Sequence, residues 1–150
     1  MFFGMPHRQY TDLTVEQQHV AIIGCCDDLL TAVADPLSHQ EIGQLRAKLA
    51  ALLHANLASE EAQLIGPIRR LAANARPPRF LELSAEAADL RSRYSEHVGQ
   101  WTRQMIESDH ETYARAAAEL VACVKSHLNR KRAVLADWKH AAVNAALPRA

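Results

Sequence analysis

Residues 42 to 64 carry the pattern that most restricts how this chain can fold. Large apolar side chains recur there at steps of three and four residues, which is the period of an α-helix that buries one face. Two polar residues, Asn56 and Glu60, lie on the same face, one helical turn apart. A charged side chain is almost never buried without a partner, so Glu60 requires a metal ion, a cation or a hydrogen-bond network beside it.

Capping signals define where two helices in the first half of the chain begin. Thr14 and Gln17 form a capping box that opens a first helix. Ser38 and Glu41 form a second box, which opens the helix described above. A glycine-proline pair at residues 66–67 is expected to kink or end that helix, because proline lacks a backbone donor and clashes with the preceding turn.

The second half of the chain predicts two further helices. Ser84 is the expected cap of a third helix, whose inward stripe continues to Met105. A capping box at Ser108 and Glu111 then opens a fourth helix, whose inward stripe continues to Trp138.

These signals predict an all-α fold. No strand-like alternation, internal repeat or low-complexity tract interrupts the helical period. We expect one domain, an antiparallel up-down four-helix bundle over residues 14–146, preceded by an N-terminal arm at residues 1–13. The length of 150 residues, with 49% hydrophobic residues, suits a single core of this kind.

Composition excludes several classes of partner. Seventeen basic residues balance seventeen acidic ones, which argues against binding to nucleic acid or to an anionic membrane. Three cysteines, two of them adjacent, do not form a disulfide framework, so we expect a cytoplasmic protein. The start of the chain does not read as a secretory signal, and no window approaches the apolar length of a membrane span.

Polar side chains on the inward faces of all four helices are expected to meet in one central layer. They are His19 on the first helix, Asn56 and Glu60 on the second, His97 on the third, and His127 and Lys131 on the fourth. On the second and fourth helices the two polar positions are four residues apart, and these helices run in the same direction. If Asn56 and His127 lie at the same height in the bundle, Glu60 and Lys131 therefore do so as well. Tyr94 and Trp101, on the inward stripe of the third helix, are expected to line the site.

The spacing of these residues resembles the hemerythrin-like family, also called the HHE cation-binding domain, over roughly residues 14 to 138. That family is a four-helix bundle that holds two iron ions. Its ligands are a histidine on the first helix, an H-x-x-x-E motif on the second, one or two histidines on the third, and an H-x-x-x-E or H-x-x-x-x-D motif on the fourth. His19 and His97 match the first-helix and third-helix ligands.

The ligand set is degenerate in comparison with that family. Asn56 stands where the second helix would carry its histidine, and Lys131 stands where the fourth helix would carry its carboxylate. Trp101 occupies the place of a second histidine on the third helix. Glu60 is the only bridging carboxylate left, and an ammonium adds positive charge, so a standard di-iron centre is not expected.

Three alternatives remain for the central site. In the first, His97, His127 and Glu60 hold a single iron or zinc ion, with His19 as a fourth ligand. In the second, the site is a metal-free remnant in which the ammonium of Lys131 pairs with Glu60. In the third, one or two of the inward histidines His19, His97 and His127 hold a haem between the helices.

Binding is expected rather than catalysis. No nucleophile beside a base, glycine-rich phosphate loop or carboxylate dyad occurs in the sequence. The resemblance implies an iron-binding protein that senses a small gas such as O2 or NO, or that handles iron. Non-haem iron is the first expectation for the cofactor, with haem or no cofactor as alternatives, and a homodimer is one option for assembly.

Overall fold

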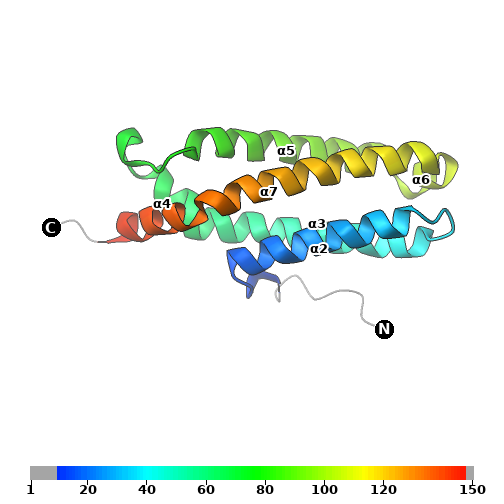
Figure 1. Ribbon diagram of the computed structural model, residues 1–150, viewed down its shortest axis with the longest axis horizontal. Coiled ribbons are helices and arrows are strands. Elements are labelled where there is room, and N and C mark those ends of the chain that lie inside the picture. Colours follow the sequence, from blue (N-terminus) through cyan, green and yellow to red (C-terminus); the bar gives the residue numbers. More distant parts are fainter. Residues whose placement is uncertain (1–9, 148–150) are drawn as a thin grey trace.

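The computed structural model describes residues 10–147 and is all-helical over that range, with no strand (Figure 1). The elements are α2 (Val15–Val33), α3 (His39–Glu60), the π-helical turn η1 (Glu61–Ile65), α4 (Gly66–Arg69), the 3-10 turn η2 (Ala73–Ala75), α5 (Phe80–Gln100), α6 (Arg103–Ser108) and α7 (His110–Ala146). The all-α prediction is therefore confirmed. Most of the predicted arm at residues 1–13 lies outside the described residues, and Tyr10, within it, is buried.

The caps of α2 and α3 differ in how well the sequence predicted them. The capping box of α2 is present, since Thr14 accepts a hydrogen bond from the backbone of Gln17 and the Gln17 side chain accepts one from Thr14. Ser38 does precede α3, but its hydroxyl donates to backbone carbonyls of the preceding turn and makes no cap bond. The predicted box between Ser38 and Glu41 was therefore wrong.

The third predicted helix begins earlier than expected. α5 starts at Phe80, after Arg79 in the left-handed region at φ 65°, and Ser84 lies inside the helix and does not cap it. The reason is tertiary packing: the ring centroid of Phe80 lies 5.2 Å from that of Trp138 on α7. Burial of Phe80 and Leu83 stabilises an additional helical turn that local capping signals do not predict.

The chain also leaves this helix earlier than expected. α5 ends at Gln100. Thr102 then caps the short α6 by accepting a hydrogen bond from the backbone of Met105. Met105 belongs to α6, and its side chain is exposed and not on an inward stripe. The predicted break before the fourth helix is present. Its cap is Asp109, however, and not the predicted Ser108.

The glycine-proline pair bends the second helix without ending it. The helix widens into the π-helical turn η1 and continues as α4. A Cβ on Gly66 would lie 2.8 Å from the carbonyl oxygen of Glu61, so this wide turn accepts only glycine without adjustment.

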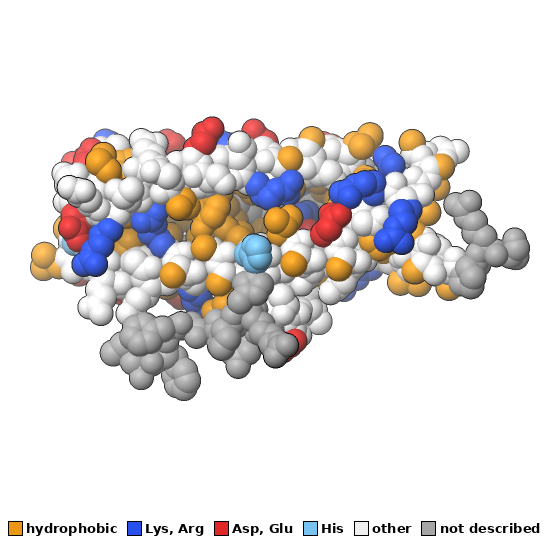
Figure 2. All heavy atoms as spheres, turned by 180° about the vertical axis from the view of Figure 1, so that it is seen from behind, with side chains coloured by type: hydrophobic (Ala, Val, Ile, Leu, Met, Phe, Trp, Pro, Cys, Tyr) orange, Lys and Arg blue, Asp and Glu red, His pale blue; other side chains and the backbone are white. Residues whose placement is uncertain are grey.

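The long helices pack unevenly. α2 lies against α3 and α7, and α5 lies against α7 (Figure 1). α3 and α5, by contrast, hardly touch, and cavities lie between them. Figure 2 shows hydrophobic side chains in the hollow of this groove, with Lys and Arg side chains along its edges. None of the helices described is both long and apolar enough to cross a bilayer.

Candidate functional site

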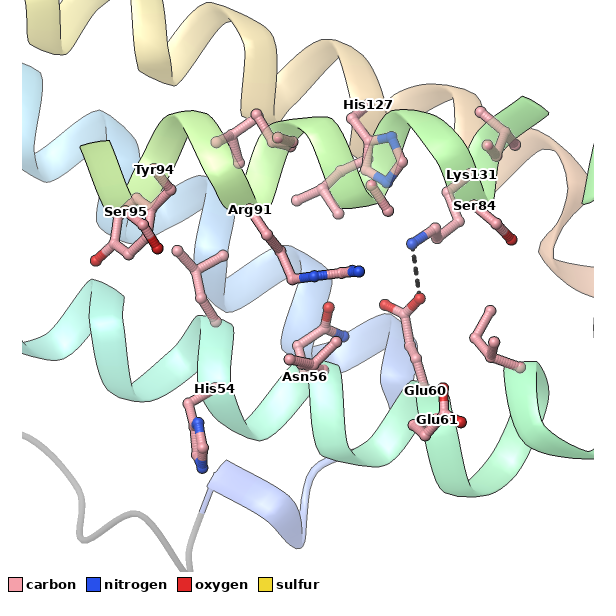
Figure 3. Close-up of a pocket in the computed structure, with 18 of the residues that line it drawn as sticks. His54, Asn56, Glu60, Glu61, Ser84, Arg91, Tyr94, Ser95, His127 and Lys131 are labelled. Carbon is pink, nitrogen blue, oxygen red and sulfur yellow. Dashed lines mark hydrogen bonds and ion pairs between the residues drawn. The ribbon is translucent and has the colours of Figure 1, made fainter. Parts of the chain in front are cut away.

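Glu60 is the centre of a buried network that joins three helices. Its Oε2 lies 2.8 Å from Nε2 of His19 on α2. Its Oε1 lies 2.7 Å from Nζ of Lys131 on α7 (Figure 3). Each of the three residues is at most 6% exposed. The predicted convergence of these residues, and the pairing of Glu60 with Lys131 given as one alternative, are both present.

The charge of Glu60 is maintained by its two partners. Burial alone would raise the pKa of this carboxyl group. The hydrogen bond to His19, together with the charge and the hydrogen bond of Lys131, outweighs burial and lowers the pKa from 4.5 to about 2. At neutral pH the site therefore contains a carboxylate beside an ammonium group.

Asn56 belongs to a second polar cluster beside this network. Its Nδ2 donates to Oε1 of Gln18 at 3.1 Å, and Nε2 of Gln18 donates to the Tyr10 carbonyl oxygen at 2.9 Å and to Oγ of Ser59 at 2.8 Å. Sequence reasoning missed Gln18, which is fully buried. Its signal was its place three residues after Val15 on the inward stripe of α2.

His127 is held by a carboxylate that sequence reasoning did not assign to the site. Nδ1 of His127 lies 2.9 Å from Oε1 of Glu86 on α5, and Arg130 also pairs with Glu86. Because an ionised carboxylate only accepts, Nδ1 carries the proton and Nε2 is left with a lone pair. Within the described chain, Nε2 is buried and has no hydrogen-bond partner.

The surroundings of His127 favour its neutral form. Burial is the largest cause that lowers its pKa, and the charge of Lys131 adds to it, while Glu86 acts in the opposite direction. With Ser84 as the expected cap, Glu86 would lie in the first turn of its helix, whereas α5 begins at Phe80. Its signal was its position between Leu83 and Leu90, at steps of three and four residues.

His97 does not join Glu60 and His127. α5 reaches His127 through Glu86, and His97 comes eleven positions after Glu86, which is roughly 16 Å along a helix. His97 instead packs near Tyr113, with 5.8 Å between ring centroids, and lines a separate cavity with Trp101. Over the described residues, no three or more His, Cys, Asp or Glu side chains are grouped so as to hold a metal ion.

A cavity of about 440 Å³ lies beside the network, between α3, α5 and α7. Most of its wall is apolar, contributed by side chains such as Leu53, Leu57, Ile65, Leu83, Leu90 and Leu128. Asn56, Glu60, His127 and Lys131 form its polar side, and Arg91 extends into it from α5 (Figure 3). Tyr94 lines this cavity and the separate one, whereas Trp101 lines only the latter.

The donor set does not fit a di-iron centre. The ammonium of Lys131 lies 2.7 Å from Glu60, the carboxylate that would have to bridge two ions, and it brings a positive charge to that position. Asn56 supplies an amide, already bonded to Gln18, where a histidine ligand would be needed.

Comparisons of the chain with protein-family models, with curated proteins and with solved structures find no match. The hemerythrin-like resemblance therefore depends on the sequence motifs alone.

Proposed function

We propose that this chain is a binding protein, an up-down four-helix bundle of hemerythrin-like type, that holds haem in the cavity between α3, α5 and α7. His127 would hold the haem iron. The observation that carries the proposal is the neutral His127, whose Nε2 is unpartnered in the described chain and which lines an apolar cavity of about 440 Å³.

The hydrogen bond between His127 and Glu86 supports this role. Histidines that bind metals usually donate the other ring N–H to a carboxylate or carbonyl group, which fixes the tautomer and makes the ligating nitrogen more basic. A buried polar atom with no partner costs about 1–3 kcal/mol, so a bound group that accepts the Nε2 lone pair would remove this penalty. His19 also has an unpartnered nitrogen among the described residues, but it lines neither cavity.

The walls of the cavity suit a large, mostly apolar group. Its volume lies within the range of about 300–1,000 Å³ that is usual for ligand sites. Leucine side chains from α3, α5 and α7 supply apolar contact for a porphyrin, and Arg91 supplies a cation for a propionate group.

The buried ion pair argues against non-haem iron in the same place. Glu60 already has a full set of charged and polar partners in Lys131 and His19. An iron ion bound by Glu60 would have to displace a buried ammonium group, at a cost of several kcal/mol. The haem alternative leaves this pair intact.

Haem held by His127 would supply the binding of a small gas such as O2 or NO, so we propose gas sensing rather than catalysis. The buried thiols of Cys25 and Cys26 suit a reducing compartment, and we propose a cytoplasmic location. A second candidate is a metal-free bundle that binds an apolar organic molecule. It is favoured by the Glu60–Lys131 pair, which neutralises the site without a metal ion.

Titration of the purified protein with haemin tests the proposal. We expect a Soret band at one haem per chain, a loss of affinity of at least about tenfold in His127→Ala, and no change in His97→Ala, which removes an inward histidine outside the cavity. Glu86→Gln should shift the spectrum, because it weakens the partner of His127.

An unchanged titration of His127→Ala would overturn this assignment. Iron bound by the purified protein without a Soret band would instead support the non-haem alternative. If the protein binds neither haemin nor iron, the metal-free candidate is favoured.

A further inference from the structure

A second cavity, of about 340 Å³, lies farther along the groove between α3 and α5. It adjoins the first cavity, because Ala50, Tyr94 and Val124 line both. Its distinctive lining residues are one cation, Arg46, and the ring side chains of His97, Trp101 and Tyr113. The proposed haem site uses none of these four residues.

Tyr113, one of the residues that line this cavity, carries a polar group without a hydrogen-bond partner among the described residues. The side chain is fully buried, and its hydroxyl makes no hydrogen bond to any part of the chain that the structure describes. A buried tyrosine hydroxyl normally has a partner, because losing water without one is costly. Burial also raises the pKa of Tyr113, so the phenol keeps its proton and can donate.

Arg46 supplies a positive charge that no carboxylate neutralises. Its guanidinium lies 5.7 Å from the ring centroid of Tyr113, and it forms no ion pair with any described acidic residue. His97 does not add a second charge, since burial, assisted by Arg46, lowers its pKa. The cavity therefore offers one cation, the phenol groups of Tyr94 and Tyr113, and aromatic walls.

We propose that this second cavity binds an organic monocarboxylate with an apolar or aromatic body. The carboxylate would accept hydrogen bonds from the guanidinium of Arg46 and the hydroxyl of Tyr113, which are both donors. The body of the ligand would pack against Trp101 and Tyr94, where ring contacts favour an aromatic or branched group. The volume suits a molecule about the size of a substituted benzene.

The two tryptophans of the chain make the test specific to one cavity. Trp101 lines the second cavity and Trp138 lines the first, and the sequence contains no other tryptophan. In Trp138→Phe the fluorescence therefore reports only Trp101. We expect hydrocinnamate to give a saturable change of this signal, and its uncharged amide to bind at least about tenfold more weakly, because it lacks the charge.

Variants of the polar groups complete the experiment. In the Trp138→Phe background, Arg46→Met should weaken hydrocinnamate binding about 10- to 100-fold and Tyr113→Phe about 3- to 10-fold. Arg46→Lys keeps the charge and should have a smaller effect. Arg91→Met, a matched loss of a cation in the first cavity, should have none.

The outcomes separate this site from the proposed haem site. His127→Ala should leave hydrocinnamate binding unchanged, so failure of the haem proposal would not affect this one. Equal affinity for the acid and the amide, full binding by Arg46→Met, or no saturable change at about 10 mM hydrocinnamate would overturn the proposal. A signal from Trp138 alone, measured in Trp101→Phe, would place the ligand in the first cavity and overturn it as well.

Discussion

Replacing Lys131 by methionine tests the central network directly. Methionine keeps the length and the apolar stem of lysine but removes the ammonium, so Glu60 would keep only the hydrogen bond to His19. The carboxylate would then remain buried without its opposite charge. We expect a marked loss of stability at neutral pH.

The size of this loss follows from the pKa of Glu60. The partners lower it from 4.5 to about 2, and a shift of this size corresponds to about 3 kcal/mol of folding free energy at neutral pH. The hydrogen bond of His19 and the charge and hydrogen bond of Lys131 both lower this pKa, against the effect of burial. In Lys131→Met only His19 would offset the cost of burying the Glu60 carboxylate. We therefore expect this variant to lose about 2–3 kcal/mol of folding free energy at pH 7.

The pH dependence gives a second, independent measurement. The folded-state pKa is lowered, so this stability is present above pH 4.5 and is lost as the pH falls toward 2. Urea unfolding followed by circular dichroism should show the difference between wild type and Lys131→Met shrinking over that interval.

Arg69→Met is the matched control for this experiment. It breaks the pair between Arg69 and Glu61, whose side chains are 60% and 49% exposed, and should cost less than about 1 kcal/mol. Equal losses for the two variants, or a difference from wild type that does not vary with pH, would refute the reasoning.

Two further predictions concern the turn after Glu60 and the metal ligands. Gly66→Ala should cost about 1–3 kcal/mol of stability in urea unfolding, because its Cβ would lie 2.8 Å from the Glu61 carbonyl oxygen. The control is Gly43→Ala in α3, where a Cβ meets open space, and it should stabilise the protein by about 0.5–1 kcal/mol. The opposite order of stabilities would contradict the geometry. Combining Asn56→His with Lys131→Glu should increase the iron bound per chain after reconstitution with ferrous iron. An unchanged metal content would argue against the hemerythrin-like arrangement.

Local signals predicted the first half of the fold better than the second. The box at Thr14 and the inward stripe of α2 involve residues close in sequence, so capping and periodicity determine them. The start of α5 depends instead on Phe80 meeting Trp138, which is distant in sequence. A contact of that kind has no local signature beyond the apolar residues themselves.

The sequence also predicted some residues of the candidate site correctly and others not. Glu60 and Lys131 could be matched because α3 and α7 carry polar pairs at the same four-residue step, and the structure brings them together. The sequence could not predict the height of His97 along the bundle relative to Glu60 and His127. Periodicity determines which face of a helix points inward, but not how far the helix is shifted along its axis. That position is determined by the chain leaving α5 at Gln100 and by Glu86 pairing with His127.

The network at Glu60 also determines which helix can move when a ligand binds. It ties α2, α3 and α7 together through buried groups, whereas α5 contributes none of its members. α5 is attached to α7 by the pair between Glu86 and His127 and by the contact of Phe80 with Trp138, and it hardly touches α3. A change in the width of either cavity therefore costs least when α5 shifts relative to α3.

We accordingly expect haemin or hydrocinnamate to slow amide hydrogen exchange mainly in α5. Both cavities lie between α5 and α3, and a bound ligand would supply the contacts that this interface lacks. Ile22, in the buried middle of α2, lines neither cavity and serves as the internal reference, with little change of its amide exchange on binding. Protection that rises equally in α2 and α5 would mean that the whole bundle tightens, and the picture of one loosely attached helix would then be wrong.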